Sequence, residues 1–292
     1  MLKTYITDFL AYCKVVDFSL KSIESLSISL RELAGFAAIK KLDHVEDITY
    51  GYLSDFVADF KEPSIHKKKA RVWCLHQFFH FLTVTGPLKK NIALGLPYPK
   101  IEKTVPHFLT IEEFKRILDF FSAKVDSDNG LRNLVMILIL GLLGVRTGTI
   151  IALDVEHIDT KDRLAWIKEK GRRQRQIALP EVLANLLKIY INSLHLKKGP
   201  LFLSIRKKRI SPRVLQEMFR SAADTLGIDK RLHARLFRHT AATHLNKVAG
   251  TTITQAVLGH ERRHNTLKYA HLNPDKYAVY MKRHPFMREV QA

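Results

Sequence analysis

The sequence has few cysteines, far fewer acidic than basic residues, and no apolar run long enough to cross a membrane. Its 292 residues include only Cys13 and Cys74, which lie in apolar helical patterns and match no known pairing motif. They are therefore predicted to be buried thiols of a reducing compartment. The longest apolar run, Leu134 to Val145, is shorter than the roughly 20 residues of a membrane span. No N-terminal stretch resembles a signal peptide, so a cytoplasmic protein is expected.

Motifs for nucleotide hydrolysis and for metal binding are also missing. No Walker A pattern occurs in the chain. His76 with His80, and His260 with His264, have the spacing of zinc ligands, but neither pair carries the glutamate of His-Glu-x-x-His or a third ligand nearby. We therefore expect no bound metal and no cofactor.

The net charge indicates the partner. The chain carries 48 Lys and Arg against 28 Asp and Glu, a net charge of +20. Residues 1–105 contribute 15 basic against 11 acidic residues, and the remainder contributes 33 against 17. Because duplex DNA carries about one negative charge per 1.7 Å, this excess suits a nucleic acid. A basic housekeeping protein and a membrane-surface protein are the alternatives, although no polybasic tail beside a lipid-anchor motif supports the latter.

Composition divides the chain into two domains. Residues 1–85 show four or five apolar helical patterns and predict a helical domain. Residues 86–105 form a linker, in which residues 86–99 hold three prolines and two glycines. Residues 106–292 form the second domain, which opens at Thr110 and Glu113 with a capping box. Its last predicted element is a short helix from about residue 273.

The fourth helical pattern of the first domain has a basic first turn and an aromatic second half. The basic side chains are Lys67, Lys68, Lys69 and Arg71. They could bind phosphates or enter a DNA groove, and a solvated charged helix face is the equally open alternative.

One segment of the second domain predicts a β-hairpin. Residues 163–169 and 174–179 alternate between apolar and polar side chains, and Lys170-Gly171-Arg172-Arg173 separates them. Lys170 would lie near the tip of the hairpin. Arg172, Arg173 and Arg175 are candidates for phosphate contacts.

Five short motifs then follow one another in a particular order. They are Gly144-Val145-Arg146, the hairpin with Lys170, residues 238–245 beginning Arg-His-Thr, Leu258-Gly259-His260, and Tyr269 nine residues after His260. Each is weak alone, but in this order they resemble the tyrosine recombinase, or phage integrase, family over about residues 106–275. The resemblance implies a mainly α fold, with a helical core-binding domain of the SAM-like type before a mixed α/β catalytic domain that contains a small β-hairpin or sheet.

The resemblance also implies a role for each residue. Arg146 and Arg238 would clamp the non-bridging oxygens of the scissile phosphate, because the planar guanidinium donates to two oxygens and stays charged. Lys170 would protonate the departing 5′ oxygen. His260 would hydrogen-bond the phosphate and assist proton movement. Tyr269 would be the nucleophile, leaving a 3′-phosphotyrosyl bond and a free 5′ hydroxyl.

Two positions depart from the family's pattern. Arg235 stands three residues before Arg238, where the family usually carries histidine, and an arginine cannot accept a proton. Thr149 stands three residues after Arg146, where the family tends to carry a carboxylate. His233, two residues before Arg235, could take the place of the missing histidine if the loop followed a different path.

The sequence is therefore identified as similar to compact, Xer-like, site-specific tyrosine recombinases, whose two domains would clamp opposite faces of a DNA duplex. The implied partners are double-stranded DNA, other copies of the chain in a tetrameric synapse, and either an accessory protein or a second recombinase. Integration, excision and dimer resolution all remain open, and the expected location is the nucleoid if the source is prokaryotic. A DNA-binding relative with weak or lost cleavage and a type IB-like topoisomerase are the alternatives. The C-terminal helix would dock on a neighbouring protomer or, alternatively, pack on its own domain.

Overall fold

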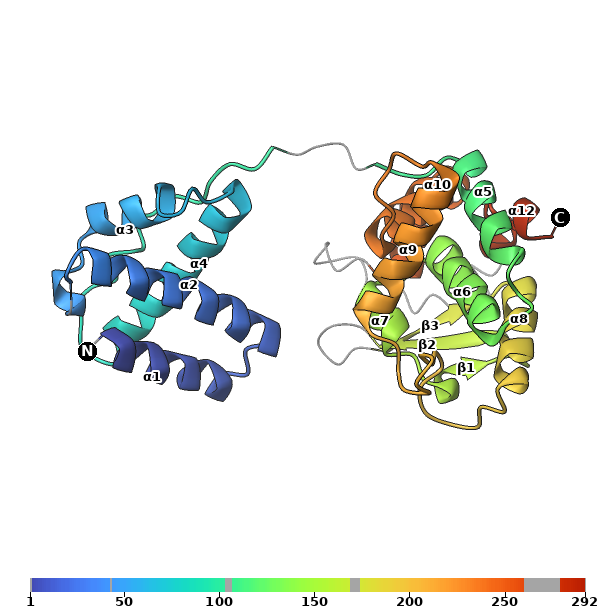
Figure 1. Cartoon of the computed structure of the whole chain (residues 1–292), viewed down its shortest axis with the longest axis horizontal. Coiled ribbons are helices and arrows are strands. Elements are labelled where there is room, and N and C mark those ends of the chain that lie inside the picture. Colours follow the sequence, from blue (N-terminus) through green and yellow to red (C-terminus); the bar gives the residue numbers. More distant parts are fainter. Residues whose placement is uncertain (1, 43, 103–106, 169–173, 260–278, 292) are drawn as a thin grey trace. The chain divides into compact units, whose positions relative to one another are not determined.

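The computed structural model divides into two compact units, residues 1–104 and 105–292, each with its own hydrophobic core (Figure 1). The structure describes residues 2–42, 44–102, 107–168, 174–259 and 279–291. None of the helices in these ranges is both long enough and apolar enough to span a membrane.

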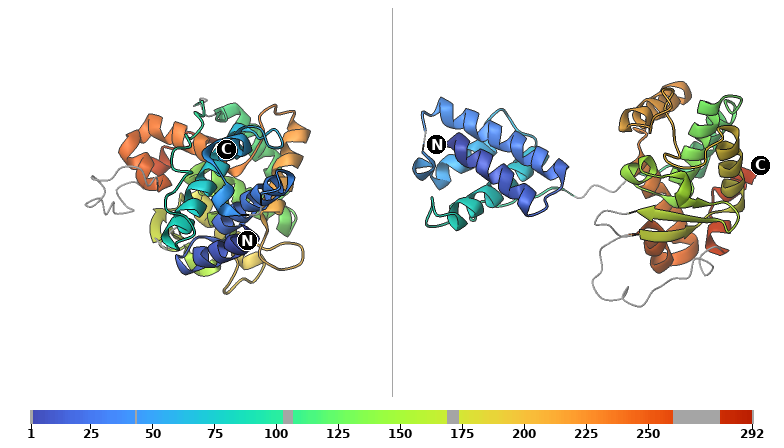
Figure 2. Two further views of the ribbon diagram at one scale, coloured as in Figure 1. Left: turned by 90° about the vertical axis from the view of Figure 1, so that its left-hand side faces the viewer. Right: turned by 90° about the horizontal axis from the view of Figure 1, so that it is seen from below.

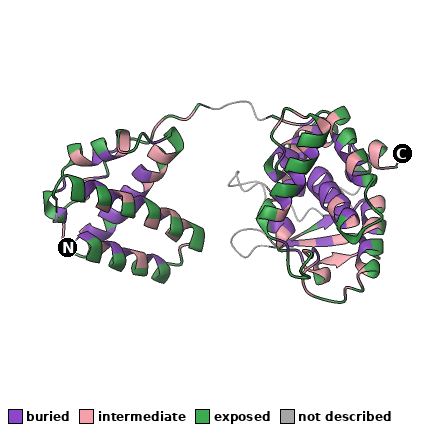
Figure 3. Cartoon of the chain, in the orientation of Figure 1, coloured by how far each residue is buried: buried purple, intermediate pink, exposed green. Residues whose placement is uncertain are grey.

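Unit 1 is helical, as the periodicity predicted. It contains α1 (Leu2–Val15), α2 (Leu20–Ile39), the short 3-10 helix η1 (Val45–Asp47), α3 (Tyr50–Ala58) and α4 (Ile65–Val84). Hydroxyl side chains start three of these helices, because Ser19, Thr49 and Ser64 each accept a hydrogen bond from a first-turn amide. Helix α4 packs against α1, α2 and α3, and the buried residues of the unit face its interior (Figure 3).

Arg71 of α4 lies in the core of unit 1 and is fully buried. Its guanidinium donates to Glu32 Oε2 at 2.9 Å and to the Phe56 carbonyl oxygen at 2.7 Å, and it lies 4.5 Å from the centre of the Phe56 ring. The prediction that Arg71 contacts DNA therefore needs correction, because its charge is neutralised inside the domain. Lys67 also reaches Glu32, at 2.6 Å. Burial opposes ionisation of Glu32, but the hydrogen bonds from Lys67 and Arg71 outweigh it and lower the pKa of this carboxyl.

Unit 2 is built around one buried helix. The apolar run Leu134–Val145 is buried throughout. It forms the C-terminal part of α6 (Asp128–Leu138) and the whole of the π-helix η2 (Ile139–Leu143). Helices α5 (Ile111–Ser122), α8 (Glu181–Ser193) and α10 (Ala234–Leu258) pack against this central element. The run is thus long and apolar because neighbours surround it. The other helical elements in the described part of the unit are α7 (Thr147–Ile151), η3 (Val155–His157), α9 (Pro212–Leu226) and α12 (Met287–Gln291).

A three-stranded antiparallel sheet lies on one side of this unit (Figures 1 and 2). Its strands are β1 (Ile158–Asp159), β2 (Leu164–Lys168) and β3 (Gln174–Ala178), in that order. Strands β2 and β3 pair with Lys168 opposite Gln174, which confirms the predicted hairpin strands. The connecting residues, which include Lys170, Arg172 and Arg173, lie outside the described residues. The roles expected of these three side chains stay predictions.

The described part of the C-terminal segment, residues 279–291, packs on its own unit. Met281, Phe286 and Met287 are buried in the core. The Phe286 ring stacks on Phe114 of α5, with ring centres 3.7 Å apart, and Glu289 pairs with Lys115 at 3.2 Å. Of the two alternatives for the chain end, packing in cis is thus the arrangement of this part of the chain.

Candidate active site

Helix α10 begins at a histidine cap. His233 is the N-cap residue, and its Nδ1 accepts a hydrogen bond from the Leu236 amide at 3.0 Å. Burial, followed by the positive charges of Arg231 and Arg235, lowers the pKa of His233. A lowered pKa favours the neutral imidazole, whose unprotonated Nδ1 can accept the hydrogen bond from the Leu236 amide. The Nδ1 atom of His233 thus caps the N-terminus of α10. Arg235 is exposed on the first turn that this cap creates.

Arg238 lies one turn further along α10 and is 8% exposed. Its Nη1 donates to the Gly144 carbonyl oxygen at 2.8 Å, and its Nη2 donates to the Leu258 carbonyl oxygen at 2.6 Å. The backbone of α10 is not helical at Gly250 (φ 73°, ψ 174°), so the residues from there to Leu258 form a separate helical segment of α10. The guanidinium therefore joins the end of η2 to the end of that second segment.

Gly144 makes that approach possible. Its φ is +58°, and a Cβ at this position would lie 2.4 Å from Leu258 Cδ2 and 3.1 Å from the Ala241 Cβ. Only glycine meets both requirements without strain. The preceding segment, η2, is a π-helix, a rare geometry that occurs frequently at functional sites.

Arg146 follows Gly144 and is the N-cap residue of α7. Its Nη2 donates to the Gly259 carbonyl oxygen at 3.4 Å. The two arginines that the sequence singled out are thus brought to the carbonyl groups of adjacent residues, Leu258 and Gly259. Thr149 is buried in α7, with 8% of its surface exposed.

A third arginine reaches the same helix end from β3. Arg175 Nη1 donates to the Ala256 carbonyl oxygen at 3.2 Å and also to the Val257 carbonyl oxygen. Arg175 was predicted from the sequence to contact DNA phosphates, and these bonds to the helix end were not predicted. The signal that could have revealed them is a helix ending at Leu258-Gly259, whose last carbonyl groups need donors.

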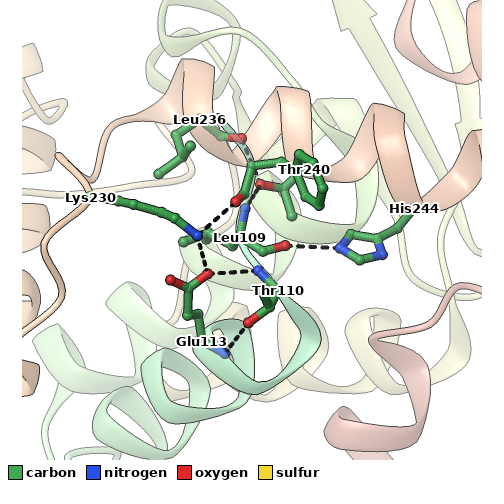
Figure 4. A network of polar contacts seen from close by, with 8 residues as sticks. Leu109, Thr110, Glu113, Lys230, Leu236, Thr240 and His244 are labelled. Carbon is green, nitrogen blue, oxygen red and sulfur yellow. Dashed lines mark hydrogen bonds and ion pairs between the residues drawn. The ribbon is translucent and has the colours of Figure 1, made fainter. Parts of the chain in front are cut away.

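The opposite face of α10 is anchored to the start of unit 2 (Figure 4). The Thr240 hydroxyl accepts a hydrogen bond from the Leu109 amide at 2.8 Å and donates to the Leu236 carbonyl oxygen at 2.8 Å. His244 Nε2 lies 2.9 Å from the Leu109 carbonyl oxygen. Residues 236, 240 and 244 recur every fourth position and so share one helix face, whereas Arg238 belongs to another.

An ion pair completes this anchor. Lys230 Nζ donates to Glu113 Oε2 at 2.6 Å and to the Phe108 carbonyl oxygen at 3.1 Å. Glu113 also closes the predicted capping box with Thr110, and the structure confirms that box. The segment that precedes α10 is thereby fixed to the first turn of α5 (Figure 4).

His260 and Tyr269, the other two residues predicted to be catalytic alongside Lys170, lie outside the described residues. Among the described residues, no three His, Cys, Asp or Glu side chains gather in a way that could hold a metal ion.

Residues 107–276 match the model of the phage integrase family. The chain belongs to the phage integrase family. The match covers the whole arginine cluster described above and extends through Tyr269. The sequence-based resemblance and the fold class predicted from it are both confirmed.

The chain is similar to recombinases known from sequence and from solved structures. The tyrosine recombinase XerC of Thermodesulfovibrio yellowstonii is 26% identical over 298 residues, covering 98% of this chain and 97% of the relative. The fold is shared with the recombinase XerH bound to its difH substrate before cleavage (TM-score 0.68, 19% identity, 94% of this chain and 80% of that one). It is also shared with a lambda integrase tetramer bound to a Holliday junction (TM-score 0.70, 15% identity, 91% and 80%).

Proposed function

We propose that this protein, a tyrosine recombinase, breaks and rejoins DNA strands at specific sites through a 3′-phosphotyrosyl intermediate on Tyr269. One observation carries the proposal. Arg146 and Arg238 come from different elements and donate to the carbonyl groups of adjacent residues, and the next residue in the sequence is His260. Two guanidinium groups held together offer the charge and the planar donor pairs that a phosphodiester requires.

The surroundings of Arg238 suit electrostatic stabilisation. This side chain is nearly buried, and two backbone carbonyl groups fix its direction. Donors that are already oriented stabilise charge on a reacting phosphate without reorganising during the reaction. The low dielectric of a buried site strengthens that interaction.

The proposed reaction follows from these charges. The Tyr269 oxygen attacks the phosphorus and forms the new P–O bond, while the bond to the 5′ oxygen breaks. Lys170 gives a proton to that leaving oxygen. His260 hydrogen-bonds the phosphate and assists the departure of the phenolic proton. Attack by a 5′ hydroxyl of a partner strand then reverses these steps and rejoins the DNA.

The partner is double-stranded DNA, which the net charge of +20 suits. Lys67, Lys68 and Lys69 of α4, together with Arg172, Arg173 and Arg235, are proposed to bind phosphates. Self-association on DNA, an accessory protein or second recombinase, and a place at the nucleoid belong to the same proposal. The lambda integrase tetramer supports the self-association by its fold. The family match favours strand exchange over the topoisomerase and non-catalytic alternatives.

The test uses the whole protein and nicked DNA fragments from its source genome, separated on a denaturing gel. Wild type is expected to form a DNA adduct that survives detergent and disappears with protease. Tyr269→Phe should form none while its DNA binding persists, and Tyr280→Phe is the matched control that should still form the adduct. An adduct in Tyr269→Phe, or binding without any adduct in wild type, would contradict the proposal. Sequencing the trapped fragments would then identify the site.

A further inference from the structure

The last turn of α10 has an unusual set of hydrogen-bond partners. The Gly259 amide donates to the Gln255 carbonyl oxygen and closes the last hydrogen bond of the helix. The next four carbonyl groups, those of residues 256–259, therefore have no partner within the helix. In this structure three guanidinium groups supply the partners.

These three groups divide the carbonyl groups among themselves. Arg175 of β3 donates to the carbonyl oxygens of residues 256 and 257. Arg238 donates to that of residue 258, and Arg146 donates to that of residue 259. All four carbonyl oxygens at the negative end of the helix are thus bound by cations, which the helix dipole favours. Hydrogen bonds from charged donors are also stronger than neutral ones.

Arg175 differs from the other two arginines. Arg146 and Arg238 are the proposed phosphate clamp, whereas the Nη1 of Arg175 is shared by two carbonyl groups and its side chain is half-buried. It links the sheet to the helix end on which the clamp rests. Its position therefore controls where the carbonyl groups of Leu258 and Gly259 hold the other two guanidinium groups.

We propose that Arg175 is a positioning residue for phosphoryl transfer: it fixes the last turn of α10 to β3 and thereby holds Arg146 and Arg238 in register for the scissile phosphate. The proposal rests on the proposed recombinase function. It replaces the expectation that Arg175 is a phosphate contact. A displacement of a reacting group by about 1 Å can cost about 100-fold in rate, so the predicted effect is on cleavage and not on DNA binding.

The test compares Arg175→Ala and Arg175→Lys with Arg163→Ala, which removes a cation just before β2, the strand that pairs with β3. Arg163 is exposed and pairs with Glu181 at 3.2 Å. DNA affinity and single-turnover cleavage are measured on nicked target DNA. Arg175→Ala is expected to lose about 100-fold in cleavage rate with little change in affinity, and Arg175→Lys should recover part of the loss. Arg163→Ala should resemble wild type.

A second substrate identifies the route of the effect. A methylphosphonate at the scissile position replaces one charged non-bridging oxygen with a methyl group, so the clamp has less charge to balance. The ratio of the cleavage rates of wild type and Arg175→Ala should be smaller on this substrate than on the normal phosphodiester. An equal loss on both substrates would overturn the proposal in favour of general misfolding. A loss of affinity that matches the loss of cleavage would overturn it in favour of a phosphate contact.

A third measurement keeps the inference separate from the proposed function. In DNA-free protein, amide hydrogen exchange in the last turns of α10 should be faster in Arg175→Ala than in wild type or Arg163→Ala. Unchanged exchange would overturn the inference even in an active enzyme. Faster exchange in a protein that never cleaves DNA would instead contradict the proposed function alone.

Discussion

The Arg238 guanidinium donates a hydrogen bond of 2.8 Å to the carbonyl oxygen of Gly144, two residues before Arg146. This bond ties the segments of the two arginines together within the buried part of unit 2. It depends on a left-handed backbone at Gly144 and on close contact between η2 and α10. The geometry of the cluster should therefore be sensitive to a single methyl group at this glycine.

Gly144→Ala tests that sensitivity, with Gly227→Ala as its matched control. Both glycines have a φ of +58°, but a Cβ at Gly227 would meet nothing within 4 Å. The backbone cost should be about 1–2 kcal/mol in both variants, and the contact with Leu258 should add about 1–3 kcal/mol for Gly144→Ala. Urea unfolding measures these costs, and DNA cleavage should fall only in Gly144→Ala. Equal effects of the two substitutions would contradict this explanation.

Arg71 and Lys69 lie on the same helix and should differ in role. Arg71→Leu leaves Glu32 and the Phe56 carbonyl group without their buried donor, which should cost about 3 kcal/mol of unfolding free energy. Lys69 is exposed, so Lys69→Ala should change stability by less than about 0.5 kcal/mol. It should instead reduce the salt dependence of DNA binding by about one unit of logarithmic slope.

The two tryptophans allow the unfolding to be assigned to a unit. Trp73 belongs to α4 of unit 1 and Trp166 to β2 of unit 2. In a Trp166→Phe background, fluorescence reports unit 1 alone. If Arg71→Leu in that background unfolds at the same urea concentration as the Trp166→Phe protein itself, the buried ion pair does not stabilise the domain.

Thr240→Val should weaken the anchor of α10. The substitution keeps the shape of the side chain but removes the acceptor of the Leu109 amide, whose hydrogen bond of 2.8 Å is buried. Leaving that amide unpaired should cost about 1–3 kcal/mol. Thr243→Val, on a half-buried position of the same helix, is the control and should be nearly neutral. Thermal unfolding of the two variants compares them directly.

His284 should make the stability of unit 2 depend on pH. Burial, followed by the neighbouring His244, lowers the pKa of His284 to about 3, compared with about 6.5 in an unfolded chain. The unfolded state therefore binds a proton that the folded state excludes. The stabilisation is present above pH 6.5 and is lost as the pH falls, by about 2 kcal/mol between pH 7 and pH 5.

The measurement is the free energy of unfolding at several pH values for wild type and for His284→Gln. The pKa values of His233 and His239 are also lowered, by burial and then by neighbouring cations, so both proteins should lose stability in acid. Only the difference between them reports His284. Parallel curves would contradict the assignment.

Local patterns predicted the elements of this fold well. The capping box of Thr110 and Glu113 and the alternating residues of the two hairpin strands act over a few neighbours, and each appears in the structure. The order of the arginine motifs likewise predicted the pair at Arg146 and Arg238. These features need only local sequence or a family resemblance.

Contacts between distant segments could not be predicted in this way. Arg71 looks like a member of a basic helix face, and only the positions of Glu32 and Phe56 show that it is buried. Arg175 resembles the basic residues next to it in the hairpin, and only the end of α10 explains its bonds. An arginine's partner depends on tertiary structure, whereas its charge does not.

The direction of the Arg146 side chain depends on the number of residues in the buried helix that precedes it, which ends in the π-helix Ile139–Leu143. A π-helix closes its hydrogen bonds one residue later than an α-helix, so it behaves like an α-helix with an insertion. Removing one residue from η2 itself would restore α-helical hydrogen bonds there. A deletion in the α-helical part of the run, Leu134–Leu138, has no such bulge to absorb it and would turn everything after it by about 100° and shift it by about 1.5 Å. Gly144 and Arg146 would then no longer face Arg238. In this chain, a deletion at a purely apolar position could thus be as damaging as the loss of an arginine.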